Sequence, residues 1–164
     1  MRELISTYSA SRAFFTFRAE GRLFGIELNY LREVSTHAAI TPVPLAPPGV
    51  RGLANLRSRI YLVLDLRPLV GLPPADCTSE SRLIVVKANI VEDLGLLVDS
   101  GGDIVRVEQD QIEACGELSR ATDSTDNAAG PLVVGICKLE TELMMIIDPT
   151  RFADVIAKAL DALT

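Results

Sequence analysis

The stretch VRGLANLRSRIYLVLDLRPLV, residues 50–70, decides the fold class of this chain. Its centre, residues 60–64, is a short apolar run, which is typical of a buried strand and too short to span a membrane. Asp65 ends the run and is able to cap a short helical turn through its side chain. The stretch predicts a strand followed by a capped turn, with one charged feature, Arg57, ahead of the strand. It contains no nucleophile, metal-ligand set or phosphate-binding loop.

The same pattern returns in GICKLETELMMIIDPTRFA, residues 135–153. Apolar positions stay in register between the two stretches, and two pairs anchor the ungapped alignment at an offset of 83 residues: Gly52 with Gly135, and Asp65 with Asp148. A second match, at an offset of 70 residues, contains two further pairs: Gly25 with Gly95, and Glu33 with Asp103. Because the two matches follow the same order along the chain, we predict a duplication of one small β unit.

The composition indicates a globular chain that folds without disulfide bonds. With 164 residues, it is long enough to bury about 70% of the surface that its unfolded chain exposes. Its net charge is −6, and only 5% of its residues are aromatic. Nucleic-acid binding requires clustered Lys and Arg or stacking rings, so we predict no nucleic-acid partner.

The cysteines and the apolar runs give no sign of export. Cys77, Cys115 and Cys137 lie far apart and form no CxxC pair, which argues against a zinc site or a disulfide framework. The N-terminal tail, residues 1–12, lacks the apolar core of a signal peptide, and no run approaches the length of a membrane span. We therefore expect a cytoplasmic protein without membrane insertion, metal or cofactor.

Short strands separated by Gly and Pro predict a mostly β protein. Residues 14–26 form a hairpin pattern that closes on a Gly turn. Residues 41–49 hold four of the nine prolines and must run extended over the surface. Residues 119–130 contain almost no large apolar side chain and predict a long solvent loop. Asp148 and the following proline are typical of a helix start, so a closing helix is expected over 149–163.

Five strings of this sequence resemble the CheW family of chemotaxis coupling proteins: LFGIELNYLREV, TPVPLAPP, VRGLANLRSRIYLVLDLRPLVGLP, LGLLVDSGGDIVRV and GICKLETELMMIIDPTRF. The third string is the most specific, because family members typically show Gly-x-x-Asn-Leu-Arg-Gly followed by an apolar strand and Asp-Leu-Arg. The resemblance runs from Phe14 to the C-terminal helix.

The resemblance implies an all-β fold of two packed five-stranded β-barrel subdomains with a C-terminal helix. The tail at 1–12 is then followed by a CheW-like domain at 13–163. We place its two pseudo-repeated subdomains at about 13–80 and 81–148, with strand exchange between them left open, and its closing helix at 149–163.

The resemblance also implies a non-enzymatic adaptor. It would link the cytoplasmic tip of a methyl-accepting chemoreceptor to the regulatory domain of a CheA-type histidine kinase. Such an adaptor is expected in the cytoplasm at receptor arrays on the inner membrane, and as a monomer in isolation. Two alternatives stay open: a coupling protein of a non-chemotaxis pathway, such as pilus motility or second-messenger control, and a small enzyme that uses Cys137 or the aspartates Asp65 and Asp148.

Eight residues are expected on the partner-binding surface, a groove for receptor and kinase: Leu31, Glu33, Val34, Gly52, Asn55, Arg57, Gly101 and Ile104. Arg57 matches the arginine of the family's Asn-Leu-Arg, and Glu33 matches an acidic residue thought to pair with it. Arg57 is then a structural ion-pair residue, a partner contact, or both. Leu31 and Val34 are core residues or interface residues.

Two positions depart from the family pattern. Ser58 replaces the usual glycine after Asn-Leu-Arg, which alters the turn. Gly101 stands where many members carry a bulky aliphatic residue, so apolar area that would meet a receptor helix is missing. This departure leads to the hypothesis that the protein binds a kinase regulatory barrel more dependably than a receptor tip.

The remaining candidates for chemistry have structural interpretations. His37 is the only histidine, has no Cys or carboxylate at ligand spacing, and is interpreted as a loop residue. Cys137 lies in an apolar strand and is interpreted as an inert buried thiol. Asp65 and Asp148 occupy matched places before helical turns, which favours two caps over an acid/base pair.

Overall fold

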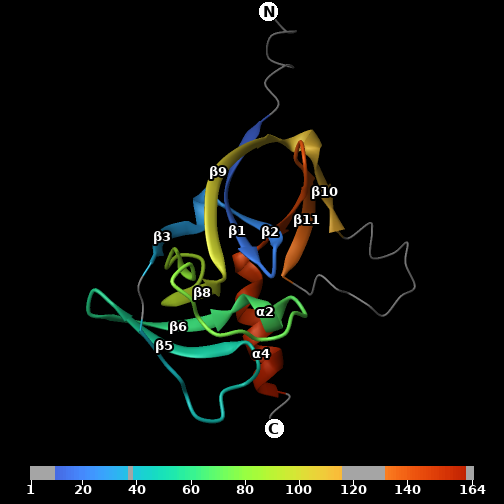
Figure 1. Cartoon of the computed structure of the whole chain (residues 1–164). Helices are drawn as coiled ribbons and strands as arrows, with labels where there is room; N and C mark the ends of the chain where they lie inside the picture. Colours follow the sequence, from blue (N-terminus) through green and yellow to red (C-terminus); the bar gives the residue numbers. More distant parts are fainter. Residues whose placement is uncertain (1–9, 37–38, 116–131, 162–164) are drawn as a thin grey trace, which may run out of the picture.

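A computed structural model describes residues 10–36, 39–115 and 132–161 of the chain (Figure 1). His37, the expected loop at 119–130 and most of the expected tail at 1–12 lie outside the described residues. Within the described ranges, two six-stranded sheets make up most of the structure, together with a few short helical segments. The prediction of an all-β fold with a C-terminal helix is confirmed.

The first sheet, sheet A, has the strand order β10-β11-β12-β2-β1-β9. Its strands have these bounds: β1 (Ser11–Ala19), β2 (Arg22–Glu27), β9 (Ser100–Glu108), β10 (Ile112–Ala114), β11 (Val133–Lys138) and β12 (Leu143–Ile147). The expected hairpin at 14–26 is the β1–β2 pair. It closes on Glu20 and Gly21, which both have positive φ, as a two-residue type I′ turn requires.

The second sheet, sheet B, has the order β3-β7-β8-β6-β5-β4. Its strands have these bounds: β3 (Leu31–Ser35), β4 (Ile40–Thr41), β5 (Val50–Leu56), β6 (Arg59–Asp65), β7 (Arg82–Val86) and β8 (Leu94–Val98). The resemblance implied five strands in each unit, and each sheet here has six because the short strands β4 and β10 each pair at one edge.

Short helical segments lie at the strand ends: η1 (Leu28–Tyr30), α2 (Leu66–Leu69), η2 (Gln109–Gln111), η3 (Pro149–Arg151) and α4 (Phe152–Asp161). The Asp65 side chain accepts a hydrogen bond from the Arg67 N–H at 3.1 Å at the start of α2. Asp148 accepts one from the Thr150 N–H at 2.9 Å at the start of η3. The interpretation of both aspartates as caps is confirmed. In the described ranges, no helix has the length and apolar character that a membrane crossing needs.

The two sheets repeat one scheme of strand pairing. Each of the hairpins β5–β6 and β11–β12 has a bulge. The first cross-strand pair after the bulge is Gly52 with Val63 in one hairpin and Gly135 with Ile146 in the other, which are equivalent positions of the repeat. The second strand of each hairpin then pairs in parallel with a strand from the other match, again at corresponding residues: Val63 with Gly95, and Ile146 with Gly25. Both sequence offsets, 83 and 70 residues, therefore recur in the strand register.

Each sheet combines strands from both halves of the chain. Sheet A takes β1 and β2 from the first half and β9 to β12 from the second, whereas sheet B takes β3 to β6 and then β7 and β8. The chain crosses from sheet A to sheet B between β2 and β3 and returns between β8 and β9. The sheets are thus interlocked, and the subdomain limits at 13–80 and 81–148 stay a prediction.

One hydrophobic core joins the two sheets. Phe17 and Phe24 enter it from sheet A, with stacked rings 6.0 Å apart, and Leu64 and Leu96 enter it from sheet B. Phe152 at the start of α4 is buried in the same cluster. Because this apolar core is shared, neither sheet separates from the other without exposing it to water.

Candidate partner-binding surface

An ion pair joins Glu33 on β3 to Arg57 in the β5–β6 turn. The Glu33 Oε2 and Arg57 Nη1 atoms lie 3.2 Å apart, although β3 and β5 are separated by three strands in the order of sheet B. Sheet B must therefore curl strongly enough to bring its two sides together. The predicted ion pair is confirmed. The Arg57 side chain is nonetheless 87% exposed, so the pair leaves most of the guanidinium open to solvent.

This exposure sets the expected effect of Arg57→Ala on stability. Exposed ion pairs contribute little because water screens them, so the free energy of unfolding should fall by less than about 1 kcal/mol. Urea unfolding of Arg57→Ala, Glu33→Ala and the double variant measures the coupling between the two residues. A loss of about 3–5 kcal/mol in the single variant would contradict this expectation, because that loss belongs to a buried pair.

The two residues of the β5–β6 turn, Arg57 and Ser58, are unfavourable for the backbone conformation of that turn. Arg57 and Ser58 have φ values of 52° and 67°, and two-residue hairpin turns of this kind favour Asn-Gly. Residues with a Cβ are disfavoured in the left-handed region because the Cβ approaches the following carbonyl oxygen. The Ser58 departure therefore places strain in the turn that presents Arg57 to solvent.

Ser58→Gly is expected to stabilise the protein by about 0.5–1 kcal/mol, since glycine adopts the left-handed region without this penalty but loses more chain entropy on folding. Thermal or urea unfolding measures the gain. Ser58→Ala is the matched control, because it removes the hydroxyl and keeps the Cβ. An equal gain in the alanine variant would show that the backbone conformation is not the cause.

Leu31 and Val34 flank Glu33 on β3 and are half-buried. Both pack against the core that the two sheets share, so part of each side chain has a core role. The rest of each side chain is open to solvent. Whether a partner covers that area stays a prediction.

Gly52 and Asn55 lie on β5 and differ in accessibility. Gly52 is buried with a φ of 150°, and a Cβ there would collide with the carbonyl group of Thr41 on β4. The glycine is explained by this close approach of two backbones. Asn55 is exposed and pairs with Ile60 across the hairpin.

Gly101 and Ile104 lie on β9, at the edge of sheet A, whereas the other six expected site residues belong to sheet B. Gly101 is exposed, and a Cβ there would lie 3.3 Å from Arg82 Cγ and 3.4 Å from Phe15 Cζ. Since Arg82 begins β7, which pairs with β3, Gly101 lies close to sheet B. A hollow of about 320 Å³ opens beside it, and its lining includes residues of four segments: Thr16, Arg18, Leu23, Val105 and Glu142.

An apolar face on the β5–β6 hairpin was missed by the sequence patterns. The apolar run 60–64 predicts a buried strand, but Ile60 is 60% exposed because it lies at the hairpin end, outside the core. Leu53 is also exposed, and the cross-strand pairs place both side chains on the same side as Asn55. We call these three residues the hairpin face. No local pattern in the sequence marks these apolar residues as exposed.

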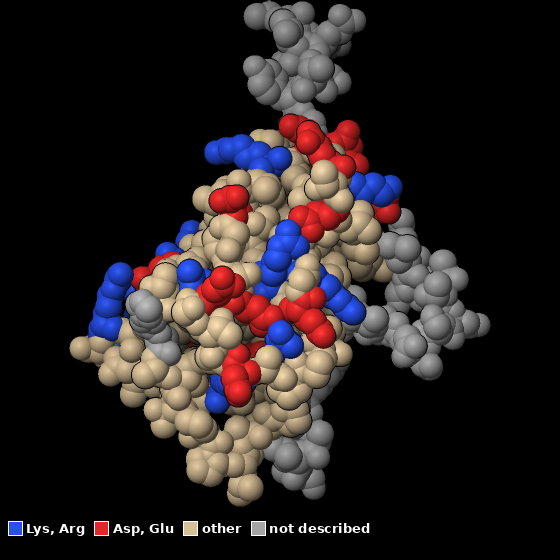
Figure 2. All heavy atoms as spheres, viewed as in Figure 1, with Lys and Arg blue, Asp and Glu red and all other residues tan. Residues whose placement is uncertain are grey.

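The segment 41–49, which leads into β5, contains no charged residue. In Figure 2 the lowest part of the view, over the segment that leads into β5, shows no Lys, Arg, Asp or Glu, whereas the hairpin end carries Arg57 and Arg59. The segment 41–49 contributes to this region, and Leu45 in it is fully open to solvent. Depletion of charge around exposed apolar residues is typical of the centre of a protein–protein interface.

Burial disfavours the reactive thiolate at two of the three cysteines, Cys137 and Cys115. Cys137 is fully buried, as expected, and this burial raises the pKa of its thiol, which disfavours the reactive thiolate. Desolvation likewise raises the pKa of Cys115. Among the residues that the structure covers, no three His, Cys, Asp or Glu side chains gather in a way that would hold a metal ion.

Three similarities to known proteins accompany this geometry. A family model described as the CheW-like domain matches residues 13–157. The chain is 29% identical over 139 residues to "Chemotaxis protein CheW" of Bacillus subtilis, covering 84% of each protein. It is 30% identical over 144 residues to "Probable chemotaxis protein CheW" of Rhizobium etli, covering 85% of this chain and 90% of that protein.

The fold has a solved counterpart as well. The crystal structure of the scaffolding protein TtCheW from Thermoanaerobacter tengcongensis superposes with a TM-score of 0.70 at 25% identity, covering 84% of this chain and 88% of that one. The repeated strand register, the ion pair behind Asn-Leu-Arg and the family match over 13–157 agree with one another. This chain therefore belongs to the CheW family.

Proposed function

We propose that this protein is a non-enzymatic adaptor that couples chemoreceptors to a CheA-type histidine kinase in chemotaxis. The observation that carries the proposal is the match of the CheW-like domain to residues 13–157, with relatives named as chemotaxis proteins over most of their length. The adaptor would act in the cytoplasm, at the receptor arrays. It would supply binding surfaces rather than chemistry.

The receptor would bind at the hairpin face. Leu53 and Ile60 present apolar area to solvent, and Arg57 adds a charge at the end of the same hairpin. A coiled-coil receptor tip carries apolar side chains at helical spacing, and such a strip docks on an apolar surface with polar contacts at its rim. Arg57 would then have both roles, since its pair with Glu33 orients it and its exposure leaves it free to bind.

The kinase would bind a different part of the two sheets. The barrel of its regulatory domain would pack against the end of a similar barrel in this protein. The shared core joins the two sheets that would carry the binding faces. A change in the receptor tip would reach the kinase as a change in the geometry of the complex, since a rigid body passes on displacement without altering its own structure.

If the receptor helix extends from the hairpin face to β9, Gly101→Val is expected to increase receptor affinity. The neighbours of a Cβ at this position are side-chain atoms of Arg82 and Phe15, which are able to shift, so valine is accommodated beside the hollow. Burying a valine side chain contributes about 1.5–3 kcal/mol, which is roughly a ten- to more than a hundredfold gain in affinity. Calorimetry with a soluble receptor hairpin measures it, and Gly101→Ala should gain less. The hypothesis of a missing apolar contact at Gly101 would be contradicted if the wild type binds the receptor hairpin tightly and Gly101→Val binds it equally well or more weakly.

Calorimetry also tests the proposed function itself. The wild-type protein is titrated separately with a soluble receptor hairpin and with the regulatory domain of the kinase. We expect saturable binding to both, with the kinase domain bound more tightly. Binding to neither partner would overturn the proposal.

A further inference from the structure

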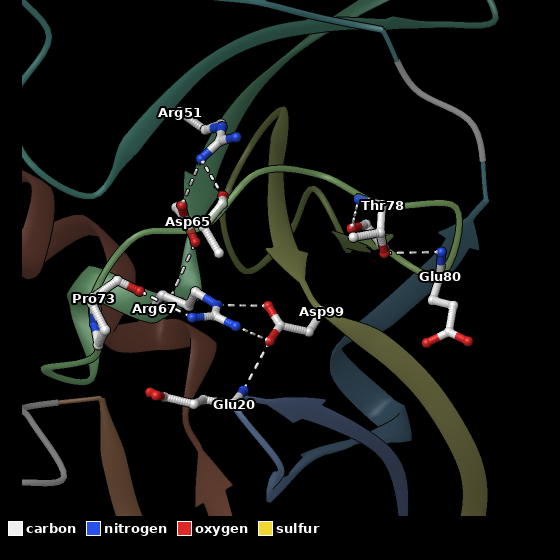
Figure 3. Close-up of polar contacts among 10 residues, drawn as sticks. Glu20, Arg51, Asp65, Arg67, Pro73, Thr78, Glu80 and Asp99 are labelled. Carbon is white, nitrogen blue, oxygen red and sulfur yellow. Dashed lines mark hydrogen bonds and ion pairs between the residues drawn. The ribbon is translucent and has the colours of Figure 1, made fainter.

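A cluster of polar contacts joins the two sheets where the chain returns from β8 to β9 (Figure 3). Asp99 lies at this crossing. Its carboxylate accepts two hydrogen bonds from the Arg67 guanidinium on α2, from Nε at 2.9 Å and from Nη2 at 2.6 Å. It also accepts one from the Glu20 N–H, at 2.8 Å, in the β1–β2 turn of sheet A. We call these three groups the Asp99 clamp.

The contacts of the clamp continue into both sheets. On the side of sheet A, the Asp99 N–H donates to the Arg18 carbonyl oxygen at 3.0 Å. On the side of sheet B, the Arg67 N–H donates to Asp65, whose other carboxylate oxygen lies 3.2 Å from Arg51 Nη1 on β5. An unbroken series of polar contacts therefore runs from β5 to the β1–β2 turn.

The clamp differs from the exposed ion pair at Arg57. The Arg67 and Asp99 side chains are only 16% and 33% exposed, and the two parallel hydrogen bonds fix the relative orientation of the two groups. The Arg67 guanidinium lowers the pKa of Asp99, so the carboxylate stays charged at neutral pH. Glu20 also has a positive φ, 49°, and its N–H is held by the carboxylate in that conformation.

The other crossing, between β2 and β3, does not repeat the clamp. The two sequence offsets place Thr150 at the position of Arg67 and Asn29 at the position of Asp99. Neither side chain ionises, so no charged pair of this kind forms there. A contact that the duplicated framework required would recur in both copies, which indicates that the clamp serves a purpose on one side of the molecule only.

We propose that Asp99 is a positioning residue that fixes the orientation of sheet A relative to sheet B, and with it the separation of the two partner-binding faces. The apolar core holds the sheets together, but apolar contact is non-directional and permits small rotations. Charge-assisted hydrogen bonds are directional and remove this freedom. The functional part of this inference rests on the proposed adaptor function, whereas its structural part concerns the isolated protein.

Spin-label distance measurements on the isolated protein test the structural part. One label replaces Leu143 on sheet A and the other replaces Ile60 on sheet B, both of which are exposed, in a background of Cys77→Ser and Cys115→Ser. Asp99→Asn keeps the shape of the side chain and removes its charge. We expect the width of the distance distribution to increase roughly twofold, because non-directional packing alone then orients the sheets.

Glu142→Gln is the matched control. Arg18 donates two hydrogen bonds to Glu142, at 2.7 and 3.0 Å, and lowers its pKa as Arg67 lowers that of Asp99. This pair joins β1 to the β11–β12 turn within sheet A, so its loss should leave the distance distribution unchanged. Arg67→Lys keeps the charge, loses the paired hydrogen bonds, and should broaden the distribution less than Asp99→Asn does.

The outcomes separate the alternatives. A wild-type width in folded Asp99→Asn, or equal broadening in Glu142→Gln, overturns the proposal. If Asp99→Asn does not fold, the distance distribution of Arg67→Lys is compared with those of the wild type and Glu142→Gln instead. For the functional part, Asp99→Asn should bind each partner separately with wild-type affinity and lose receptor control of the kinase. If the wild type binds neither partner, the adaptor function fails, while the distance measurement still decides whether Asp99 positions the sheets.

Discussion

Gly52→Ala should lower the free energy of unfolding by about 3 kcal/mol or more, as expected for backbone strain combined with a steric clash. At this position φ is 150°, and an added Cβ would collide with the Thr41 carbonyl group and lie 3.0 Å from Pro42 Cα. These are backbone atoms, so relief requires β4 to move away from β5. Urea unfolding monitored by circular dichroism measures the loss.

Gly71→Ala is the control for the backbone effect alone. Gly71 also has a positive φ, 78°, but an added Cβ would meet no atom within 4 Å. Its loss should stay near 1 kcal/mol, the usual difference for a left-handed residue that gains a Cβ. Equal losses at the two positions would show that the approach of Thr41 does not matter.

Ile60→Asp should weaken receptor-tip binding by roughly ten- to more than a hundredfold and leave stability almost unchanged. In the free protein Ile60 is 60% exposed, so the substitution removes little core contact. In the complex, burial of this side chain would contribute about 1.5–3 kcal/mol, and a buried aspartate without a partner adds a desolvation cost. Calorimetry with the receptor hairpin measures the change.

Leu143→Asp is its matched control, since Leu143 occupies the corresponding position of the other hairpin and is 57% exposed. It should retain wild-type receptor affinity. Unchanged binding by Ile60→Asp, or equal losses in the two variants, would contradict the assignment of the receptor to the hairpin face.

Features that depend on neighbouring residues could be predicted from the sequence. The caps at Asp65 and Asp148 follow from an apolar run that ends at an aspartate, and the β1–β2 hairpin follows from two apolar runs around Gly21. The repeat offsets also hold in the strand register because equivalent side chains make equivalent contacts. Glu33 and Arg57 were paired through a family resemblance rather than through any local pattern.

Features that depend on long-range pairing could not be predicted in this way. Apolar residues that alternate with polar ones indicate a strand but not which other strand pairs with it. The sequence therefore left open whether strands are exchanged between the sheets. The exposure of Ile60 depends on where the core ends, which the run IYLVL does not reveal. Arg67 and Asp99 are 32 residues apart and meet only because the chain crosses between the sheets at Asp99.

The proposed role of this protein is to couple receptor state to kinase activity without chemistry of its own. The most direct test measures kinase autophosphorylation in receptor-containing membranes, with and without this protein, in the presence and absence of an attractant. We expect attractant-sensitive kinase activity only when the protein is present, and loss of that control with Ile60→Asp but not with Leu143→Asp. Attractant control that is the same with and without the protein would contradict the proposed coupling role.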